Sequence, residues 1–415
     1  MDRREELLLN HLRECPVIDT HEHLLGEADQ PDWDVLSDYT RHYFNCDLVS
    51  AGMPPDAIEK QINDPARSVT DKWNLLEPYW EAARNTGYGW TLDLAAQAVY
   101  GVDGVRRETV EELNNRFRAL RAQKGYGRHI LRDLCGIERV MDNAWRLDAD
   151  DLGGLFWFVT QIDGWVCPDA RSLRGAGDAA SSIDGWVDIA LRELAADFAE
   201  RGARGLKCAL AYQRSLLFEK PRARDAQAGY RAMREDAEAD PALRKAAQDH
   251  IMHAILAWAN ERGLILQVHT GYQEGNGNMI AHTNPVLLNN VIGLYPGIRF
   301  DLFHMGYPYQ REMGALGKMY PNVRMDLCWA HMISPIASRD ALAEWLSAVP
   351  ATKIFAFGGD CLFFDGTAGH LELARRNVAA SLARLINEGA LSDSRARRIG
   401  EMLFYDNPKS FYQMP

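Results

Sequence analysis

The sequence of 415 residues predicts an α/β fold, namely a (β/α)8 or TIM barrel with a helical insertion after the first strand. Three observations support this prediction. Eight short apolar runs recur along the chain, helical patterns lie between most of them, and several of the runs end in a histidine or an aspartate. A doubly wound open sheet is the alternative fold, because the pattern of one sequence does not show whether a sheet closes.

The eight runs are mostly apolar at both odd and even positions, as expected of parallel strands that are covered on both faces. In chain order they are PVIDTH (16–21), IERVMDNA (137–144), LFWFVTQID (155–163), ARGLKCAL (203–210), LILQVHTG (264–271), IRFDLFHMG (298–306), VRMDLCWA (323–330) and KIFAFGGD (353–360). The carboxyl ends of barrel strands form the rim where catalytic residues lie. We therefore expect the polar residues that end these runs to face one site.

Helical periodicity marks the segments between most of these runs, and several begin at Ser or Asp and end at Gly or Pro. The clearest examples are 181–202, 240–263, 309–321, 338–350 and 371–389. Strands that alternate with helices in this way are typical of a parallel sheet covered by helices.

The segment 24–135 breaks this alternation, because it is helical in pattern and too long for a connecting loop. We expect a barrel formed by 1–23 and 136–415, with 24–135 as a helical subdomain over its mouth. The aromatic side chains of this segment are expected to form its core rather than a ligand cage: Trp33, Tyr39, Tyr43, Phe44, Trp73, Tyr79, Trp80 and Trp90.

Composition narrows the class of partner to small molecules. The formal net charge is −12 without any Lys- or Arg-rich run, which argues against binding to nucleic acid or to an anionic membrane. Seven scattered cysteines without a CxxC spacing indicate neither a disulfide framework nor a zinc ribbon, and they suit the cytoplasm. The first 15 residues predict an amphipathic helix rather than a signal peptide, and no apolar run approaches the roughly 20 residues of a membrane span.

Candidate metal ligands end several of the predicted strands. His21 and His23 in PVIDTHEHL alternate with Glu22, so both imidazoles are predicted to point to the same side of the first strand. An HxH pair alone does not decide between a metal site and chance. His269 and Asp360 also end apolar runs, and packing alone rarely places such residues there. Imidazoles with a carboxylate suit zinc or another divalent first-row ion that keeps a position open for water.

Taken in strand order, this pattern resembles that of the amidohydrolase superfamily: HxH on strand one, Lys on strand four, His on strands five and six, and Asp on strand eight. The resemblance extends from DTHEH to FGGD and leaves the insertion outside. It implies a divalent metal held by His21, His23, His269 and Asp360. His304 would be a further ligand or a catalytic group.

Lys207 is the least certain member of the pattern. The resemblance implies either a carbamylated lysine that bridges two metals, or one metal with Lys207 left to contact the substrate. The alternative is that Lys207 lies outside the barrel and snorkels to solvent. The cofactor is thus predicted to be one or two divalent ions, Zn2+ first and Mn2+ second. Metal-activated water would attack the substrate, Asp360 would accept its proton, and His304 would stabilise the oxyanion or orient the nucleophile.

The loops that follow the predicted strands carry the candidate substrate contacts. Arg214 is a candidate fork for a substrate carboxylate, although an ordinary solvated arginine is an equal alternative. The other candidates lie after strands four, five and seven: Tyr212, Tyr272, Gln273 and Trp329. His282 and His370 are predicted to be surface or capping residues. Cys361 is not expected to be a nucleophile, because strand alternation turns it away from Asp360.

These residues predict a metal-dependent hydrolase that cleaves an amide or lactone-type bond of a small, carboxylated metabolite. A nonoxidative decarboxylase and a uronate-type isomerase are alternatives on the same metal set, because the fold and the ligands do not determine the reaction. The long insertion with DYTRHYF has a loose similarity to uronate isomerases. The alternative from another class is a barrel that binds without catalysis. A homo-oligomer is compatible with the sequence, but no apolar stripe identifies an interface.

Overall fold

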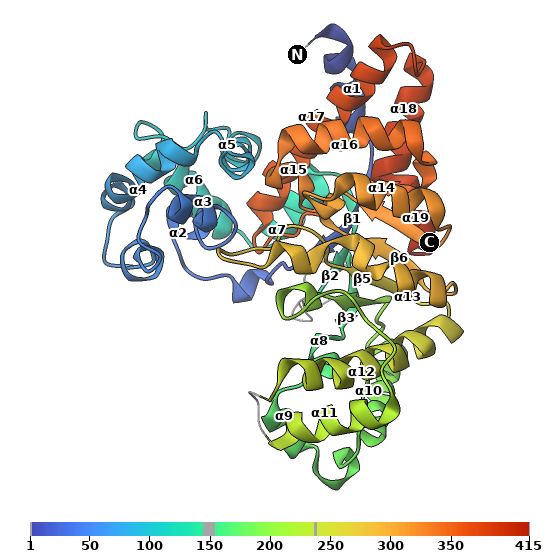
Figure 1. The fold of residues 1–415 in the computed structure, drawn as a ribbon. Helices are drawn as coiled ribbons and strands as arrows, with labels where there is room; N and C mark the ends of the chain where they lie inside the picture. The colour runs from blue at the N-terminus through green and yellow to red at the C-terminus, as the bar shows by residue number, and fades with distance from the viewer. Residues whose placement is uncertain (1, 144–153, 236–238, 415) are drawn as a thin grey trace. The chain divides into compact units, whose positions relative to one another are not determined.

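A computed structural model describes residues 2–143, 154–235 and 239–414 of the chain (Figure 1). The strands follow one another in sequence order within an eight-stranded sheet. Their bounds are β1 Val17–Glu22, β2 Ile137–Asp142, β3 Phe156–Gln161, β4 Gly205–Cys208, β5 Ile265–Val268, β6 Arg299–Leu302, β7 Val323–Asp326 and β8 Ile354–Phe355. Each of the eight apolar runs therefore contains a strand.

The sheet closes between its first and last strands. The amide of Thr20 in β1 donates to the carbonyl of Phe357 after β8, at 3.2 Å, and the amide of Asp360 donates to the carbonyl of His21, at 2.8 Å. Neighbouring strands pair in parallel wherever the register is defined. The predicted barrel is thus confirmed, and the open sheet is excluded because its two outer strands would not meet.

The chain divides into two compact units. The first comprises Met1–Phe156, Glu274–Asn278 and Asp326–Pro415, and the second comprises Trp157–Gln273 and Met279–Met325.

The first unit contains β1, β2, β8, the helices that follow β1 and the C-terminal helices. The helices between β1 and β2 are α2 Val35–Tyr39, α3 Phe44–Ser50, α4 Val69–Ala83, α5 Gly87–Tyr100, α6 Val110–Arg121 and α7 Tyr126–Arg128, with the short segments η1 Glu27–Asp29, η2 Ile58–Ile62 and η3 His129–Leu134. The remaining helices are α1 Arg3–Glu14, α15 Ala330–Ile333, α16 Pro335–Ala348, α17 Phe364–Asn387, α18 Asp393–Glu401 and α19 Asn407–Phe411, with η9 Ala351–Lys353 and η10 Met402–Asp406.

Helix α17 is the centre of the first unit, and it packs against α1, α5 and α16. Its contact with α5 is close because residue 369 is a glycine. A Cβ atom there would lie 2.2 Å from the carbonyl oxygen of Thr91, which no side chain tolerates. The helices that follow β1 are therefore packed onto the helix that follows β8.

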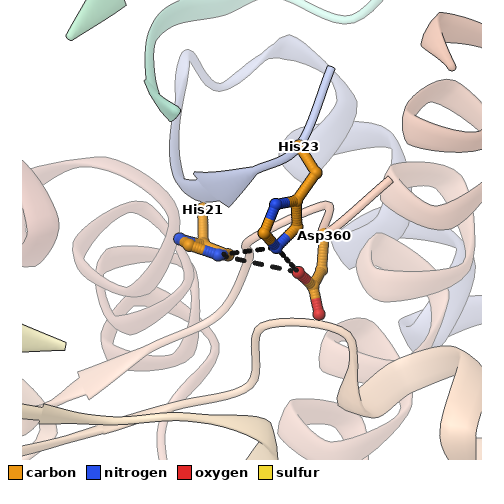
Figure 2. A group of neighbouring side chains, drawn as sticks. All are labelled: His21, His23 and Asp360. Carbon is orange, nitrogen blue, oxygen red and sulfur yellow. Dashed lines mark hydrogen bonds and ion pairs between the residues drawn. The ribbon is translucent and has the colours of Figure 1, made fainter. Parts of the chain in front are cut away.

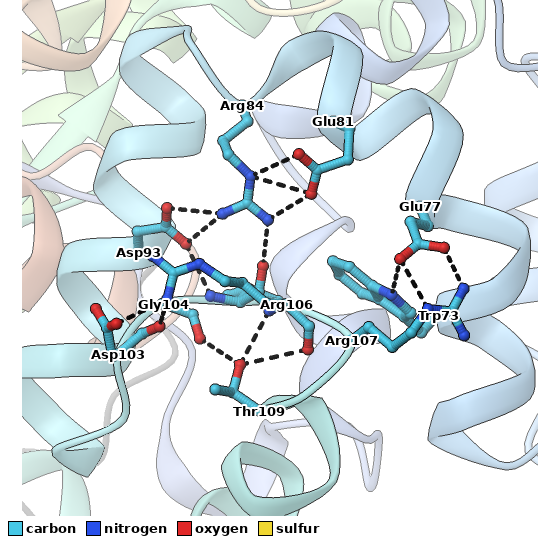
Figure 3. A network of polar contacts seen from close by, with 11 residues as sticks. Trp73, Glu77, Glu81, Arg84, Asp93, Asp103, Gly104, Arg106, Arg107 and Thr109 are labelled. Carbon is cyan, nitrogen blue, oxygen red and sulfur yellow. Dashed lines mark hydrogen bonds and ion pairs between the residues drawn. The ribbon is translucent and has the colours of Figure 1, made fainter.

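A polar network joins the C-terminal end of α4 and the middle of α5 to the loop before α6 (Figure 3). The Arg84 guanidinium donates to the carboxylates of Glu81 and Asp93 and to the carbonyl of Val105. In α4 the aromatic rings of Trp73 and Trp80 are buried, with their centroids 5.5 Å apart. These helices thus have a core of their own.

The second unit contains β4 to β6 and most of β3 and β7, with helices on the connections. These are α8 Asp163–Val166, α9 Ala170–Gly175, α10 Ile183–Ala199, α11 Ala223–Glu235, α12 Pro241–Glu261, α13 Asn289–Leu294 and α14 Gln310–Met319, with η4 Gly177–Ala180, η5 Leu210–Tyr212, η6 Ile280–Thr283, η7 Pro285–Leu288 and η8 His304–Gly306. Helices α11 and α12 pack together at Gly229, where a Cβ atom would lie 2.0 Å from the carbonyl oxygen of Leu243. Among the described residues, no helix is both long and apolar enough to cross a membrane.

Candidate metal centre

His21 in β1 and His23, directly after the strand, lie side by side. Their Nε2 atoms are 3.2 Å apart and their rings meet edge to face, with centroids 4.8 Å apart. The His21 side chain is fully buried, whereas 36% of the His23 side chain is exposed. The pair therefore lies at the boundary between the packed interior and solvent.

Asp360 completes the group from the turn that follows β8 (Figure 2). Its Oδ1 lies 3.3 Å from Nε2 of His23 and 3.7 Å from Nε2 of His21, and the carboxylate is 7% exposed. The backbone at Asp360 is left-handed, with φ of 55°. This conformation costs a residue with a side chain about 1 kcal/mol, and such strain is common at functional sites.

The three ligand atoms fit one divalent ion. Bonds of about 2.0–2.2 Å to nitrogen and oxygen place neighbouring ligand atoms about 3.0–3.6 Å apart. The observed separations are 3.2, 3.3 and 3.7 Å. Two imidazole nitrogens and one carboxylate oxygen form a donor set that suits zinc and related ions, and three protein ligands leave positions for substrate.

Two buried carboxyls from β1 hold the turn that carries Asp360. Oδ1 of Asp19 accepts from the amide of Gly359 at 3.0 Å, and Oε2 of Glu22 accepts from the amide of Cys361 at 2.5 Å. Burial raises the pKa of Asp19 to about 7 and raises the pKa of Glu22 well above its usual value. A Cβ atom on residue 359 would lie 1.8 Å from Oε1 of Glu22, so only glycine fits there.

Aromatic rings cover the same turn. The Tyr43 hydroxyl donates to the carbonyl of Asp360, and the Tyr43 ring stacks on Trp329, with centroids 4.4 Å apart. Trp329 is fully buried and left-handed, with φ of 59°. The structure thus places the predicted substrate contact Trp329 beneath Tyr43, and its contact with a substrate stays a prediction.

In the second unit, His269 and His304 also lie together. Nε2 of His304 is 2.9 Å from Nδ1 of His269, and Nε2 of His269 is 2.8 Å from the carbonyl of Tyr272. Because a carbonyl only accepts, a neutral His269 donates through Nε2 and accepts from His304 through Nδ1. A metal bound to His269 would have to replace one of these partners, and the ligand role of His269 stays a prediction.

The other predicted residues of the second unit lie on the strands and loops nearby. Lys207 in β4 is buried, with its Nζ 4.1 Å from the centroid of the Phe303 ring, so it does not reach solvent. Tyr212 is 42% exposed, and its ring centroid lies 4.7 Å from that of His269. Gln273 is buried and donates to the carbonyl of Ala211 at 2.9 Å.

Arg214 has structural partners. Its guanidinium is buried, pairs with the Asp249 carboxylate of α12, and donates to Gln248 at 3.2 Å and to the carbonyl of Leu217 at 3.0 Å. Neither the predicted carboxylate fork nor a solvated arginine describes this side chain. Its donors hold the loop after β4 onto α12, and we leave Arg214 out of the proposed site.

The prediction that His370 is a surface or capping residue was wrong. His370 is fully buried, and its Nδ1 lies 3.1 Å from the carbonyl of Gly359, next to Asp360. Burial lowers its pKa to about 3, so the ring is neutral and donates to that carbonyl. The error arose because α17 begins at Phe364, about two turns before the predicted start at 371. The glycine pair 358–359 before Asp360 was the available signal of a turn that packs closely.

Cys361 is buried, and its thiol donates to the carbonyl of Gly359 at 3.2 Å. Burial raises its pKa well above the usual value, which agrees with the expectation that it is not a nucleophile.

Comparisons with known proteins agree on the fold. The family described as "Amidohydrolase" matches residues 166–414. The uronate isomerase of Sphingopyxis alaskensis is 23% identical over 96% of this chain and 93% of its own length. Protein fluG of Emericella nidulans is 32% identical over 36% of this chain, a match that spans only 17% of fluG. The solved uronate isomerase of Thermotoga maritima, at 16% identity, has a TM-score of 0.82 over 99% of this chain and 98% of that chain.

Proposed function

Because the chain belongs to the amidohydrolase family, we propose that it is a metal-dependent enzyme that interconverts a uronate and its keto isomer. One observation carries the reaction type. The family match begins at residue 166, whereas the match to a uronate isomerase covers 96% of the chain and so includes most of the helices between β1 and β2. The expectation of a hydrolase becomes the second candidate, because these relatives are named for an isomerisation.

We assign His21, His23 and Asp360 as the ligands of the metal, on the basis of their separations and their donor chemistry. The sequence pattern adds His269 to this proposed set. A divalent ion bound by these residues would act as a Lewis acid on the oxygens of the sugar acid. Zinc is the first expectation and manganese the second, because nitrogen ligands with one carboxylate suit both.

The reaction moves one proton between neighbouring carbons. It removes a proton from the hydroxyl-bearing carbon next to the carbonyl and returns one to the carbonyl carbon, while the proton of that hydroxyl passes to the former carbonyl oxygen, so it consumes neither water nor an oxidant. A positioned carboxylate or imidazole is needed as the proton carrier, and Asp360 and His304 are the proposed groups. Lys207 is the proposed cation for the substrate carboxylate, since its side chain lies buried on β4 while Arg214 is paired with Asp249. Tyr212, exposed beside His269, is a proposed contact for the sugar hydroxyls.

The test is isomerisation of hexuronates by protein reconstituted with Zn2+ or Mn2+ after chelator treatment. Glucuronate and galacturonate are incubated in D2O, and NMR follows both the keto product and deuterium at the adjacent carbon. We expect turnover with metal, none without it, and a loss of at least about 1000-fold in Asp360→Asn. Asp393→Asn, on the exposed face of α18, serves as the matched control and is expected to retain full activity.

The second candidate, hydrolysis, is favoured by the family description alone. Hydrolysis is measured by incubating the same reconstituted protein with a panel of sugar lactones and N-acyl amino acids. If that panel is hydrolysed and no uronate is isomerised, the isomerase proposal is wrong. The number of bound metals, measured by plasma mass spectrometry, distinguishes two forms of the site: one per chain agrees with a Lys207 that contacts the substrate, and two indicate a bridging, carbamylated Lys207.

A further inference from the structure

The turn Gly359–Leu362, here called the β8 turn, has a donor for each of its four carbonyls. The first carbonyl accepts from His370 and the third from the amide of His23, at 3.1 and 3.2 Å. The second and fourth accept from residues that precede α2 or connect it to α3. The hydroxyl of Tyr43 donates to the carbonyl of Asp360, and Arg41 donates to that of Leu362.

Arg41 makes the most extensive of these contacts. Its Nη2 donates to the carbonyl of Leu362 at 2.9 Å and to Oε1 of Gln30 at 2.8 Å, while the Gln30 amide donates to the same carbonyl at 3.4 Å. The guanidinium also lies over the ring of Phe363, 5.3 Å from its centroid. The Arg41 side chain is only 6% exposed, so these contacts are shielded from water and from screening by salt.

An ion pair with Asp38 fixes the orientation of Arg41. Its Nε lies 3.0 Å from Oδ1 of Asp38, whose carboxylate is fully buried. The other oxygen of Asp38 accepts from the guanidinium of Arg121 on α6. Arg121, Asp38 and Arg41 thus form a row of alternating charges that ends on the backbone of the β8 turn. A guanidinium suits this position because its planar fork binds several acceptors at once.

We propose that Arg41 is a positioning residue for the metal ligand Asp360. The inference rests on the proposed function in one respect, since it assumes that His21, His23 and Asp360 bind a metal. Left-handed backbone at Asp360 is unfavourable unless its surroundings hold it. Without the bond from Arg41, the β8 turn relaxes and the carboxylate moves away from Nε2 of His23. Metal affinity therefore depends on a residue that does not touch the metal.

The experiment measures Co2+ affinity by competition with a chromophoric chelator, together with the visible spectrum of the bound ion. Arg41→Gln keeps a polar side chain but loses the fork and the charge. We expect its Co2+ dissociation constant to rise 10- to 100-fold, with a changed spectrum, as for other residues that orient metal ligands. The control Arg118→Gln removes an arginine of α6 that pairs with the exposed Asp32, and it is expected to match the wild type.

Two further variants cover the case in which Arg41→Gln does not fold. Arg41→Lys keeps the charge, and Tyr43→Phe removes only the hydroxyl that bonds to the carbonyl of Asp360. Both are expected to weaken Co2+ binding several-fold, and unfolding of the metal-free proteins shows that each is folded. Folded variants that bind Co2+ as tightly as the wild type overturn the role of Arg41. A wild type that binds no Co2+ overturns the proposed metal centre as well, so the two failures are distinguishable.

Discussion

At the scale of single residues, the candidate site depends on where three ligand atoms lie and on what fixes them. Two come from the end of β1 and the residue directly after it, where the alternation of an extended chain brings His21 and His23 together. The third, on Asp360, depends on a left-handed turn that no alternation rule describes. The first pair could therefore be predicted as neighbours from the sequence, whereas the orientation of Asp360 could not.

Substitution of either His21 or His23 is expected to remove the metal. In His21→Ala or His23→Ala, only two of the three ligands assigned from the structure remain, and the metal content measured by plasma mass spectrometry should fall below about one tenth of the wild-type value. His129→Ala is the control, because His129 lies on the exposed segment η3 and pairs with Asp133. Retention of both metal and activity in His21→Ala would show that the ligand assignment is wrong.

Gly359→Ala is expected to destabilise the protein by about 3 kcal/mol, because the new methyl group collides with the buried Glu22 carboxylate. Urea unfolding of the metal-free protein measures this loss without a contribution from the ion. Gly164→Ala is the control, since a Cβ atom there meets nothing within 4 Å. An unchanged free energy of unfolding in Gly359→Ala would mean that the β8 turn adapts at no cost.

At the scale of elements, the sequence predicted which segments are strands better than it predicted where each ends. The eighth run was predicted to be extended over 353–360, but β8 spans only Ile354–Phe355. The residues after it form hydrogen bonds with β1, with α17 and with the segment that connects α2 to α3. The partners in β1 and in that segment are far from the β8 turn in the sequence, so a local sequence pattern does not reveal them. The role of Arg214 could not be predicted for the same reason, because its partner Asp249 on α12 lies 35 positions away in the sequence.

The contact between Arg214 and α12 gives a prediction about stability rather than substrate binding. Asp249→Ala leaves the buried guanidinium without its carboxylate and is expected to cost about 3–5 kcal/mol in the free energy of unfolding. Asp225→Ala, at an exposed position of α11, should cost little. Should Asp249→Ala keep its stability while KM for the uronate rises, Arg214 would return to the substrate site.

At the scale of the whole molecule, buried histidines make stability depend on pH. His331 donates through Nε2 to the carbonyl of Ala356 at 2.9 Å, and burial lowers its pKa to about 4. The unfolded chain takes up a proton at this residue near pH 6.5, whereas the folded chain does not until about pH 4. Stability is therefore lost as the pH falls through this range. Asp38 changes the stability in the opposite direction, because burial raises its pKa to about 6 and the folded chain binds its proton more tightly than the unfolded chain does.

Comparing the wild type with His331→Gln separates the contribution of His331 to the pH dependence of stability from the opposing contribution of Asp38. At pH 7.5 the variant is expected to be less stable than the wild type. That difference should shrink by about 2 kcal/mol at pH 5, because the wild type alone is penalised for keeping residue 331 unprotonated. Urea unfolding at the two pH values measures the difference. A constant difference would show that His331 titrates in the folded protein as it does in the unfolded chain.

The hydrogen bond from Arg41 to the carbonyl of Leu362 joins positions 321 apart in the chain. Recombination between related barrels exchanges contiguous stretches, so a crossover at the start of β2 would separate these partners. A chimera that receives the segment 24–135 from one parent and the β8 turn from another would inherit all three ligands and yet assemble a looser centre. In protein engineering, the segment 24–135 and the β8 turn should therefore be transferred together from the same parent.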